Sequence, residues 1–305
     1  MPTPVADIVC PACGAPAQLS DVGCPACDKH LGYPNVRACQ TSGEEASLQA
    51  KYVGAKEECQ KRGCGDQFLQ FSEAVQENSR AIIGRPLGEI DRLVSSERDV
   101  HGTYYQMLDA GLKLPDDEEW SRLRHQADEA LFSGYHKHIS FALLSLTDVG
   151  STYYGSWFLA FRADTIEGRS SVFLENSAWH VKKCNYTSSE LRDMPKGLRA
   201  VWDDRGKLAA TKRMSDITET TCEQDHPGLL FSPGEQGWDA DFVEVHIYGP
   251  WNVHSVEKVV HVTNTAAPAP TTGRAARAAK GKAAETAALQ QKLGDLGIPY
   301  EEACL

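Results

Sequence analysis

Residues 10–27 read CPACGAPAQLSDVGCPAC, so that the pair Cys10-Pro-Ala-Cys13 returns as Cys24-Pro-Ala-Cys27. Two residues between paired cysteines let the backbone curl until both sulfurs point to one place, and two such pairs supply the four ligands of a closed tetrahedral site. Gly14 follows the first pair and suits the left-handed turn that the curl needs. We therefore predict a zinc ribbon over residues 1–41, with one structural zinc ion bound by Cys10, Cys13, Cys24 and Cys27.

Other uses of paired cysteines stay open for this stretch. A rubredoxin-like iron site has similar ligands, whereas a redox dithiol uses one Cys-x-x-Cys at the start of a helix in a βαβ setting, which the sequence does not show. So short a module has almost no core, so metal binding contributes on the order of 10 kcal/mol to its folding. Its basic residues Lys29, His30 and Arg37 are few, which favours a structural role or protein recognition over nucleic-acid binding.

The composition is that of an ordinary globular chain. It has 305 residues, of which 41% are hydrophobic, and a formal net charge of −11, which argues against general affinity for a nucleic-acid backbone. We find no apolar run long enough to cross a membrane and no secretory signal, so we expect a cytoplasmic protein. The ten cysteines then indicate metal binding rather than disulfides. Cys39, Cys59 and Cys64 could form another metal site, but small buried side chains explain them better.

Residues 42–133 are predicted to be helical. Apolar residues recur there at helical spacing in successive segments, which begin at Ser42, Gln67, Pro86, Val100 and Asp116 and end near Arg62, Asn78, Val94, Leu112 and Phe132. Proline is favoured at a first helical position, and acidic residues after Pro115 suit the positive end of a helix dipole. No strand is expected in this region.

Residues 134–264 change to β character. Apolar, β-branched and aromatic runs predict strands at His138–Leu146, Trp157–Arg162, Ser170–Leu174, Asp241–Tyr248 and Val256–Val262, the last two as neighbours. Leu198–Met214 is predicted to be helical. Residues 265–282, rich in Ala, Pro, Thr, Arg and Lys, are interpreted as a flexible basic linker, with a continuous basic helix from Gly273 to Leu293 as the alternative. Residues 283–305 then form a helix and a tail.

The predicted fold class is thus α+β: a zinc ribbon, a helical middle region and a mixed α+β domain. Three features of that last domain carry candidate chemistry. His136 and His138 lie at the start of the first strand, and Tyr154-Gly155 opens the second. Glu244 and His246 point to one face of a late strand, because residues two apart share a face. Each feature alone also fits ordinary packing or a solvated strand face.

Their order along the chain is similar to that of ADP-ribosyltransferases. The His on the first strand fits this order, and Tyr154-Gly155 before an apolar strand, followed by Arg169 and Asn176-Ser177, resembles the middle of such domains. The stretch 242–249, FVEVHIYG, resembles their Glu-bearing strand. The chain departs from the family pattern in having no Ser-Thr-Ser triplet and no Glu-x-Glu pair, which puts arginine as the acceptor in doubt.

The resemblance implies an ADP-ribosyltransferase-like domain that uses NAD as substrate. Glu244 would stabilise the cation formed when nicotinamide leaves the ribose, His138 would bind the adenosine ribose, and Tyr154 would stack on nicotinamide. Arg169 and Ser177 would complete the cofactor-binding set. The acceptor would be a protein or a nucleic acid, and the protein would be an intracellular toxin or defence effector with a zinc module for structure or targeting.

Two other functions remain open. One is a non-enzymatic zinc-ribbon binding or regulatory protein, in which the α+β region is an interaction domain. The other is a metal-dependent hydrolase or nuclease that would use His136, His138, Glu244 and His246. Nothing in the sequence indicates the oligomeric state.

Overall fold

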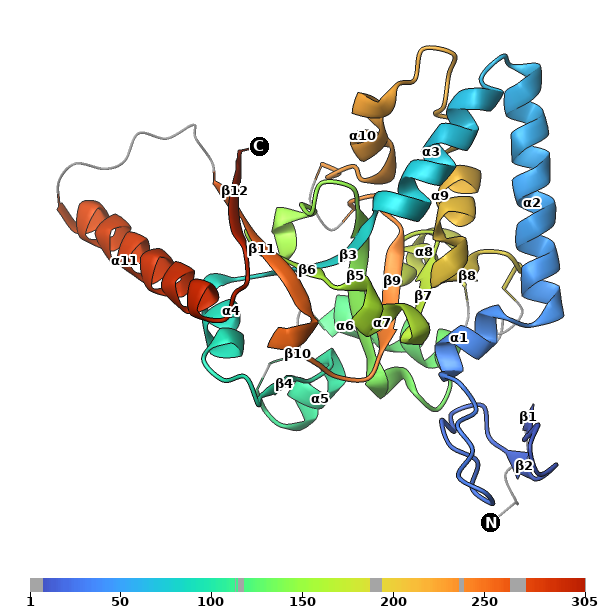
Figure 1. Ribbon diagram of the computed structural model, residues 1–305, viewed down its shortest axis with the longest axis horizontal. Helices are drawn as coiled ribbons and strands as arrows, with labels where there is room; N and C mark the ends of the chain where they lie inside the picture. Colours follow the sequence, from blue (N-terminus) through green and yellow to red (C-terminus); the bar gives the residue numbers. More distant parts are fainter. Residues whose placement is uncertain are drawn as a thin grey trace.

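An eight-stranded sheet runs through the centre of the protein (Figure 1). In this computed structural model, which describes residues 8–112, 114, 118–186, 194–235, 239–263 and 273–304, the strand order is β12-β11-β6-β3-β5-β9-β7-β8. Neighbouring strands are antiparallel, except that β11 and β12 are parallel. The strands are β3 (Arg80–Arg85), β5 (Ile139–Ser145), β6 (Trp157–Phe161), β7 (Ser170–Phe173), β8 (Arg199–Val201), β9 (Glu244–Tyr248), β11 (Val256–Thr263) and β12 (Tyr300–Cys304).

Helices lie around this sheet, so the fold is mixed α+β. In the described residues they are α1 (Pro34–Cys39), α2 (Ser42–Lys61), α3 (Gly65–Asn78), α4 (Leu87–Val94), α5 (Tyr104–Asp109), α6 (Glu118–Leu131), α7 (Ala163–Ile166), α8 (Ser177–Cys184), α9 (Arg205–Arg213), α10 (His226–Leu230) and α11 (Gly273–Asp295). Two smaller pairs of strands, β1 (Ile8–Val9) with β2 (Pro16–Ala17) and β4 (Val100–His101) with β10 (Trp251–Asn252), complete the regular structure. No helix of the described part is long and apolar enough to cross a membrane.

Strand β9 alternates as its sequence predicts. Val243, Val245 and Ile247 are buried in the main hydrophobic core, where they join apolar side chains of α3 and α9. Glu244 and His246 point to the opposite face, which α6 and the aromatic residues around it cover. The alternation therefore sends two ionisable side chains into the protein rather than into solvent.

The N-terminal module attaches to one end of the sheet through α1 (Figure 1). Arg37 donates hydrogen bonds to the backbone oxygens of Leu19 and Asp21 in the module, and Asn35 donates to the oxygen of His246 at 2.9 Å. Buried polar groups need such partners, so these contacts fix the module against β9.

The helical prediction for residues 42–133 is wrong at Arg80–Arg85, which form β3 at the middle of the sheet. This strand has four consecutive buried residues, so it lacks the period-two alternation that identifies a half-exposed strand. The helix predicted over Val100–Leu112 is shorter in the structure. Val100–His101 form β4, and α5 begins only after Thr103, whose side chain caps it. Region 42–133 thus shares one core with the later strands.

Two further predictions differ from the structure. Leu198–Met214 begins with strand β8, and its helix is confined to α9. Strand β11 pairs with β6 and β12 and is not a neighbour of β9. Partner choice in a sheet depends on contacts between distant segments, which an apolar pattern does not encode.

The predicted linker is helical from Gly273 onward, and residues 265–272 lie outside the described residues. The alternative, a continuous helix through Leu293, is confirmed. Alanine-rich sequence favours a helix intrinsically. Leu289 and Leu293 are fully buried, and Lys292 pairs with Asp91 of α4 at 2.6 Å, so tertiary contacts hold the helix as well.

Candidate functional site

The four N-terminal cysteines meet at one point. Their sulfur atoms all lie within 4.8 Å of one another, with 3.8 Å between Cys10 and Cys27 and 3.6 Å between Cys13 and Cys24. A tetrahedron with metal–sulfur bonds of 2.3 Å has edges of about 3.8 Å. The spacing therefore fits a metal ion such as zinc bound by four thiolates.

The backbone of each cysteine pair is shaped for this purpose. The amide of Gly14 donates to the Cys10 oxygen and that of Asp28 to the Cys24 oxygen, and both residues have positive φ. Hydrogen bonds from the backbone amides of Cys13 and Ala12 lower the pKa of the Cys10 thiol to about 6. Such amides stabilise thiolate, which is the form that binds metal.

The remaining cysteines of the N-terminal half lie in the core. Cys39, Cys59 and Cys64 are each at most 3% exposed, and they form no metal-ligand cluster within the described part of the chain. They fill space as small buried side chains.

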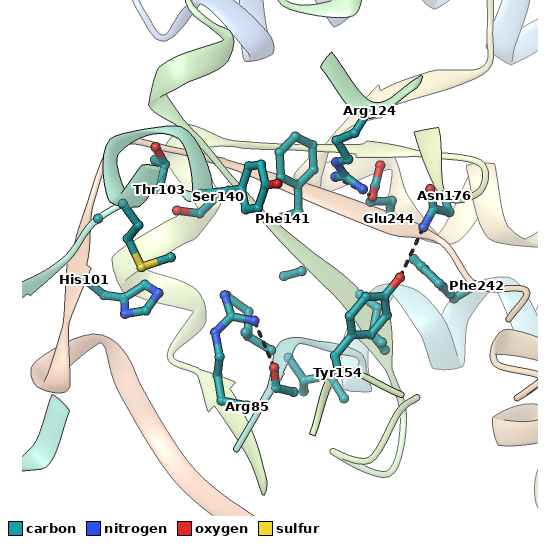
Figure 2. Close-up of a pocket in the computed structure, with 18 of the residues that line it drawn as sticks. Arg85, His101, Thr103, Arg124, Ser140, Phe141, Tyr154, Asn176, Phe242 and Glu244 are labelled. Carbon is teal, nitrogen blue, oxygen red and sulfur yellow. Dashed lines mark hydrogen bonds and ion pairs between the residues drawn. The ribbon is translucent and has the colours of Figure 1, made fainter. Parts of the chain in front are cut away.

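A cavity of about 160 Å³ lies between the sheet and helices α5 and α6 (Figure 2). Its floor comes from β3 and β5, and Glu244 of β9 and Tyr154 of the 3-10 turn Thr152–Tyr154 also line it. Figure 2 shows Arg124 and Glu244 next to each other at one end, with Asn176 and Tyr154 beside them, and His101 and Thr103 at the other end. Ser121 and Ser140 also line it, and their buried hydroxyls have no hydrogen-bond partner among the described residues.

Glu244 is held by groups from three other positions of the chain. Its Oε2 accepts from the Ser177 amide at 3.0 Å and lies 2.9 Å from Nε2 of His246. Its Oε1 lies 3.3 Å from Nη2 of Arg124. Burial by itself would raise the pKa of Glu244, but Arg124, His246 and the Ser177 amide together lower it to about 2. Glu244 is therefore ionised at any physiological pH.

A second carboxylate shares the same guanidinium. Asp128, one helical turn after Arg124 on α6, lies 3.4 Å from Nε of Arg124 and accepts from the Tyr105 hydroxyl at 2.8 Å. Burial raises the pKa of Asp128 to about 6, although Arg124 and Tyr105 act against that rise. One arginine thus faces two carboxylates, and this group of three side chains carries a net negative charge when both carboxyls are ionised.

Gly155 fixes the position of Tyr154. Its φ of 136° is rarely adopted by residues with a side chain, and an added Cβ would lie 2.2 Å from the backbone carbon of Arg85. At Gly84 of β3 an added Cβ would lie 3.2 Å from Cε1 of Phe158 and 3.4 Å from Cβ of Tyr154, so the strand packs closely against both side chains there. Burial raises the pKa of Tyr154 to about 12, so its hydroxyl stays protonated.

The residues named from sequence divide between this cavity and other places. Glu244 and Tyr154 line the cavity, and Ser177 contributes its backbone amide to Glu244. Arg169 instead donates to the backbone oxygens of Tyr248 and Pro250, which is a structural contact.

His136 and His138, which lie just before β5, are not next to Glu244. His138 is exposed and its ring lies 5.7 Å from that of Tyr248, outside the cavity lining. His136, His138, Glu244 and His246 do not form one metal-ligand cluster in the described residues.

The sequence patterns did not identify Arg124 and Asp128 as residues of the site. The only local signal was their spacing of four residues on a predicted helix, which is common on solvated helix faces.

No protein-family model matches the chain, and no curated protein matches it.

Proposed function

We propose that this protein is an NAD-dependent ADP-ribosyltransferase that binds the nicotinamide end of NAD in the cavity beside Glu244. The observation that supports this most is that Glu244 and Tyr154, chosen from separate parts of the sequence, line one cavity. The ionised state of Glu244 supports it further, because a carboxylate is needed to stabilise a cation.

The cavity size supports a single ring as its occupant. A cavity of about 150 Å³ can hold benzene, so the 160 Å³ found here suits the nicotinamide ring and not a whole dinucleotide. Tyr154 and Phe141 supply aromatic surface for the ring. The free hydroxyls of Ser121 and Ser140 suit its carboxamide group. The rest of NAD would extend outside the cavity, and Arg85, a partly exposed lining residue that pairs with Glu89, is a candidate partner for the pyrophosphate.

The contacts of Glu244 suggest how its charge is used. When the bond between nicotinamide and ribose breaks, nicotinamide leaves with the electron pair and the ribose becomes an oxocarbenium-like cation, which the acceptor nucleophile, or water in its absence, then attacks with loss of a proton. The Ser177 amide and His246 hold Oε2 of Glu244. Oε1 exchanges its longer contact with Arg124 for the ribose hydroxyls, and Arg124 keeps Asp128 as partner. The carboxylate is then positioned before the charge develops.

The test is NAD consumption by purified protein. Glu244→Gln keeps the size of the side chain and removes its charge, so we expect a rate loss on the order of 100-fold or more, about 3 kcal/mol. Glu175→Gln is a matched control, since Glu175 is also buried and bonded to a histidine, His180, but lies outside the cavity lining. Circular dichroism checks that both variants fold.

Equal NAD turnover by the wild type and Glu244→Gln would remove Glu244 from the mechanism. If calorimetry detects no NAD binding with the cysteine site filled, the transferase function fails. A non-enzymatic binding protein then takes its place. One observation favours that second function: both oxygens of Glu244 already have partners within the protein, as in a structural charge network.

We also propose that the ion bound by Cys10, Cys13, Cys24 and Cys27 is zinc, with a structural role. Four thiolates make a closed site with no position for a substrate. The module is joined to the sheet through α1, so the metal would stabilise the segment that packs behind β9.

A further inference from the structure

A second group of metal-ligating side chains lies at the carboxyl end of α6. His125 and Glu129 are four residues apart and therefore share a face of the helix. The chain then turns at Gly134, whose φ is 81°, and brings His136 back to the same face. One ligand atom from each of the three residues lies within 4.8 Å of the others.

His136 is partly exposed, but its two ring nitrogens are buried and lack, within the described part of the chain, the contacts that buried polar atoms normally make. Both of its ring nitrogens are inaccessible to solvent and have no hydrogen-bond partner in the described residues. Buried polar atoms without partners are uncommon and call for an explanation such as an unseen ion. Nε2 of His125 lies 3.4 Å from Oε1 of Glu129, and the two side chains are 49% and 56% exposed.

We propose that His125, Glu129 and His136 bind a zinc ion at a second metal site with an open coordination position. Two imidazoles and one carboxylate form a ligand set typical of zinc sites that keep a water molecule or another exogenous ligand. Imidazole is also a better ligand for zinc than for magnesium or calcium, which prefer oxygen. The ion would occupy the space between the three side chains and give one nitrogen of His136 its missing partner.

This site would be coupled to the wall of the neighbouring cavity. The Tyr105 ring lies 5.0 Å from the His136 ring and 5.8 Å from that of His125, and its hydroxyl donates to Asp128. Thr103 at the start of α5 bonds to the Lys137 oxygen, beside His136. A bound ion would join α6 to the turn after it and so fix the side of α5 that lines the cavity. The proposal does not depend on the activity of the cavity.

The test is zinc stoichiometry of the full-length protein after incubation with zinc and desalting. We expect two zinc ions per chain for the wild type and one for His125→Ala, Glu129→Ala and His136→Ala. The first two side chains are half exposed, so their loss should leave the fold intact, which circular dichroism checks. In a calorimetric zinc titration each variant should bind the second ion on the order of 100-fold more weakly, or not at all.

Two controls identify the site. His138→Ala, an exposed histidine two residues from His136, should keep two ions. Cys24→Ser with Cys27→Ser should lose the other ion and keep this one. A wild type that holds a single zinc ion, or His125→Ala that holds as much zinc as the wild type, would overturn the proposal.

Discussion

Replacing Arg124 by methionine should destabilise the protein strongly and in a pH-dependent way. The change keeps much of the apolar contact with Phe141, whose ring centre lies 3.9 Å from the guanidinium, but leaves Glu244 and Asp128 without their cation. Both carboxylates are at most 2% exposed. Breaking a buried charge pair from one side costs about 3–5 kcal/mol.

The pKa of Glu244 gives the direction in which this cost depends on pH. Arg124, His246 and the Ser177 amide together lower the pKa of Glu244 to about 2 from an ordinary 4.5, so they stabilise its ionised form in the folded protein. Because this pKa is lowered in the folded protein, the stabilisation is complete above pH 4.5 and is lost as the pH falls toward 2. Without Arg124 burial raises the pKa of both carboxyls, so folding must bind protons, and the cost should increase between pH 5 and pH 8.

Urea unfolding at pH 5 and pH 8 measures this cost. Arg122→Met is the control, since Arg122 is exposed on the same helix, and it should change stability by less than about 0.5 kcal/mol. Adding Glu244→Gln to Arg124→Met should restore part of the loss, because it removes one unpaired charge. The reasoning is refuted if the loss is the same at both pH values, or if the double variant is no more stable than Arg124→Met.

Two more outcomes concern the zinc module and Gly155. Cys24→Ser with Cys27→Ser should lower the zinc content measured by elemental analysis by one ion per chain and unfold only the first forty or so residues, which limited proteolysis would show; a variant that kept the full zinc content of the wild type would exclude these ligands. Gly155→Ala should cost about 2 kcal/mol or more in thermal or urea unfolding, because its φ is positive and its Cβ would collide with the Arg85 backbone. Gly168→Ala, where an added Cβ meets nothing within 4 Å, should change stability little, and equal effects would contradict the steric argument.

Local sequence patterns predicted much of the secondary structure. Helices α2, α3 and α6 and strands β5, β6, β7 and β9 lie where periodicity and composition predicted them. Periodicity failed where both faces of a strand are buried, as in β3, because nothing then alternates. Periodicity also did not decide between a flexible linker and a helix for residues 273–282, which form the first part of α11, because the helix docks through two buried leucines near its other end.

The candidate site was only partly visible for a related reason. Strand alternation alone placed Glu244 away from the aliphatic face, and the motif Tyr154-Gly155 depends on a local backbone conformation. Arg124 contacts Glu244 across 120 residues of sequence, and neither residue type nor spacing indicates such a contact. His138 was a reasonable candidate by its order in the chain. It precedes β5, however, whose first residue Ile139 pairs with Tyr248 and not with Glu244, so His138 does not line the cavity.

The sequence by itself determined what depends on neighbours in the chain: four cysteines at ligand spacing, a strand with one aliphatic and one polar face, and a glycine after Tyr154. Only the tertiary structure decided which strands pair, that α6 brings Arg124 and Asp128 to Glu244, and that His125 and Glu129 meet His136 after the turn at Gly134. The physical reason is that local conformation follows from backbone sterics and side-chain period, whereas contacts between distant residues follow from how whole elements bury their apolar faces together.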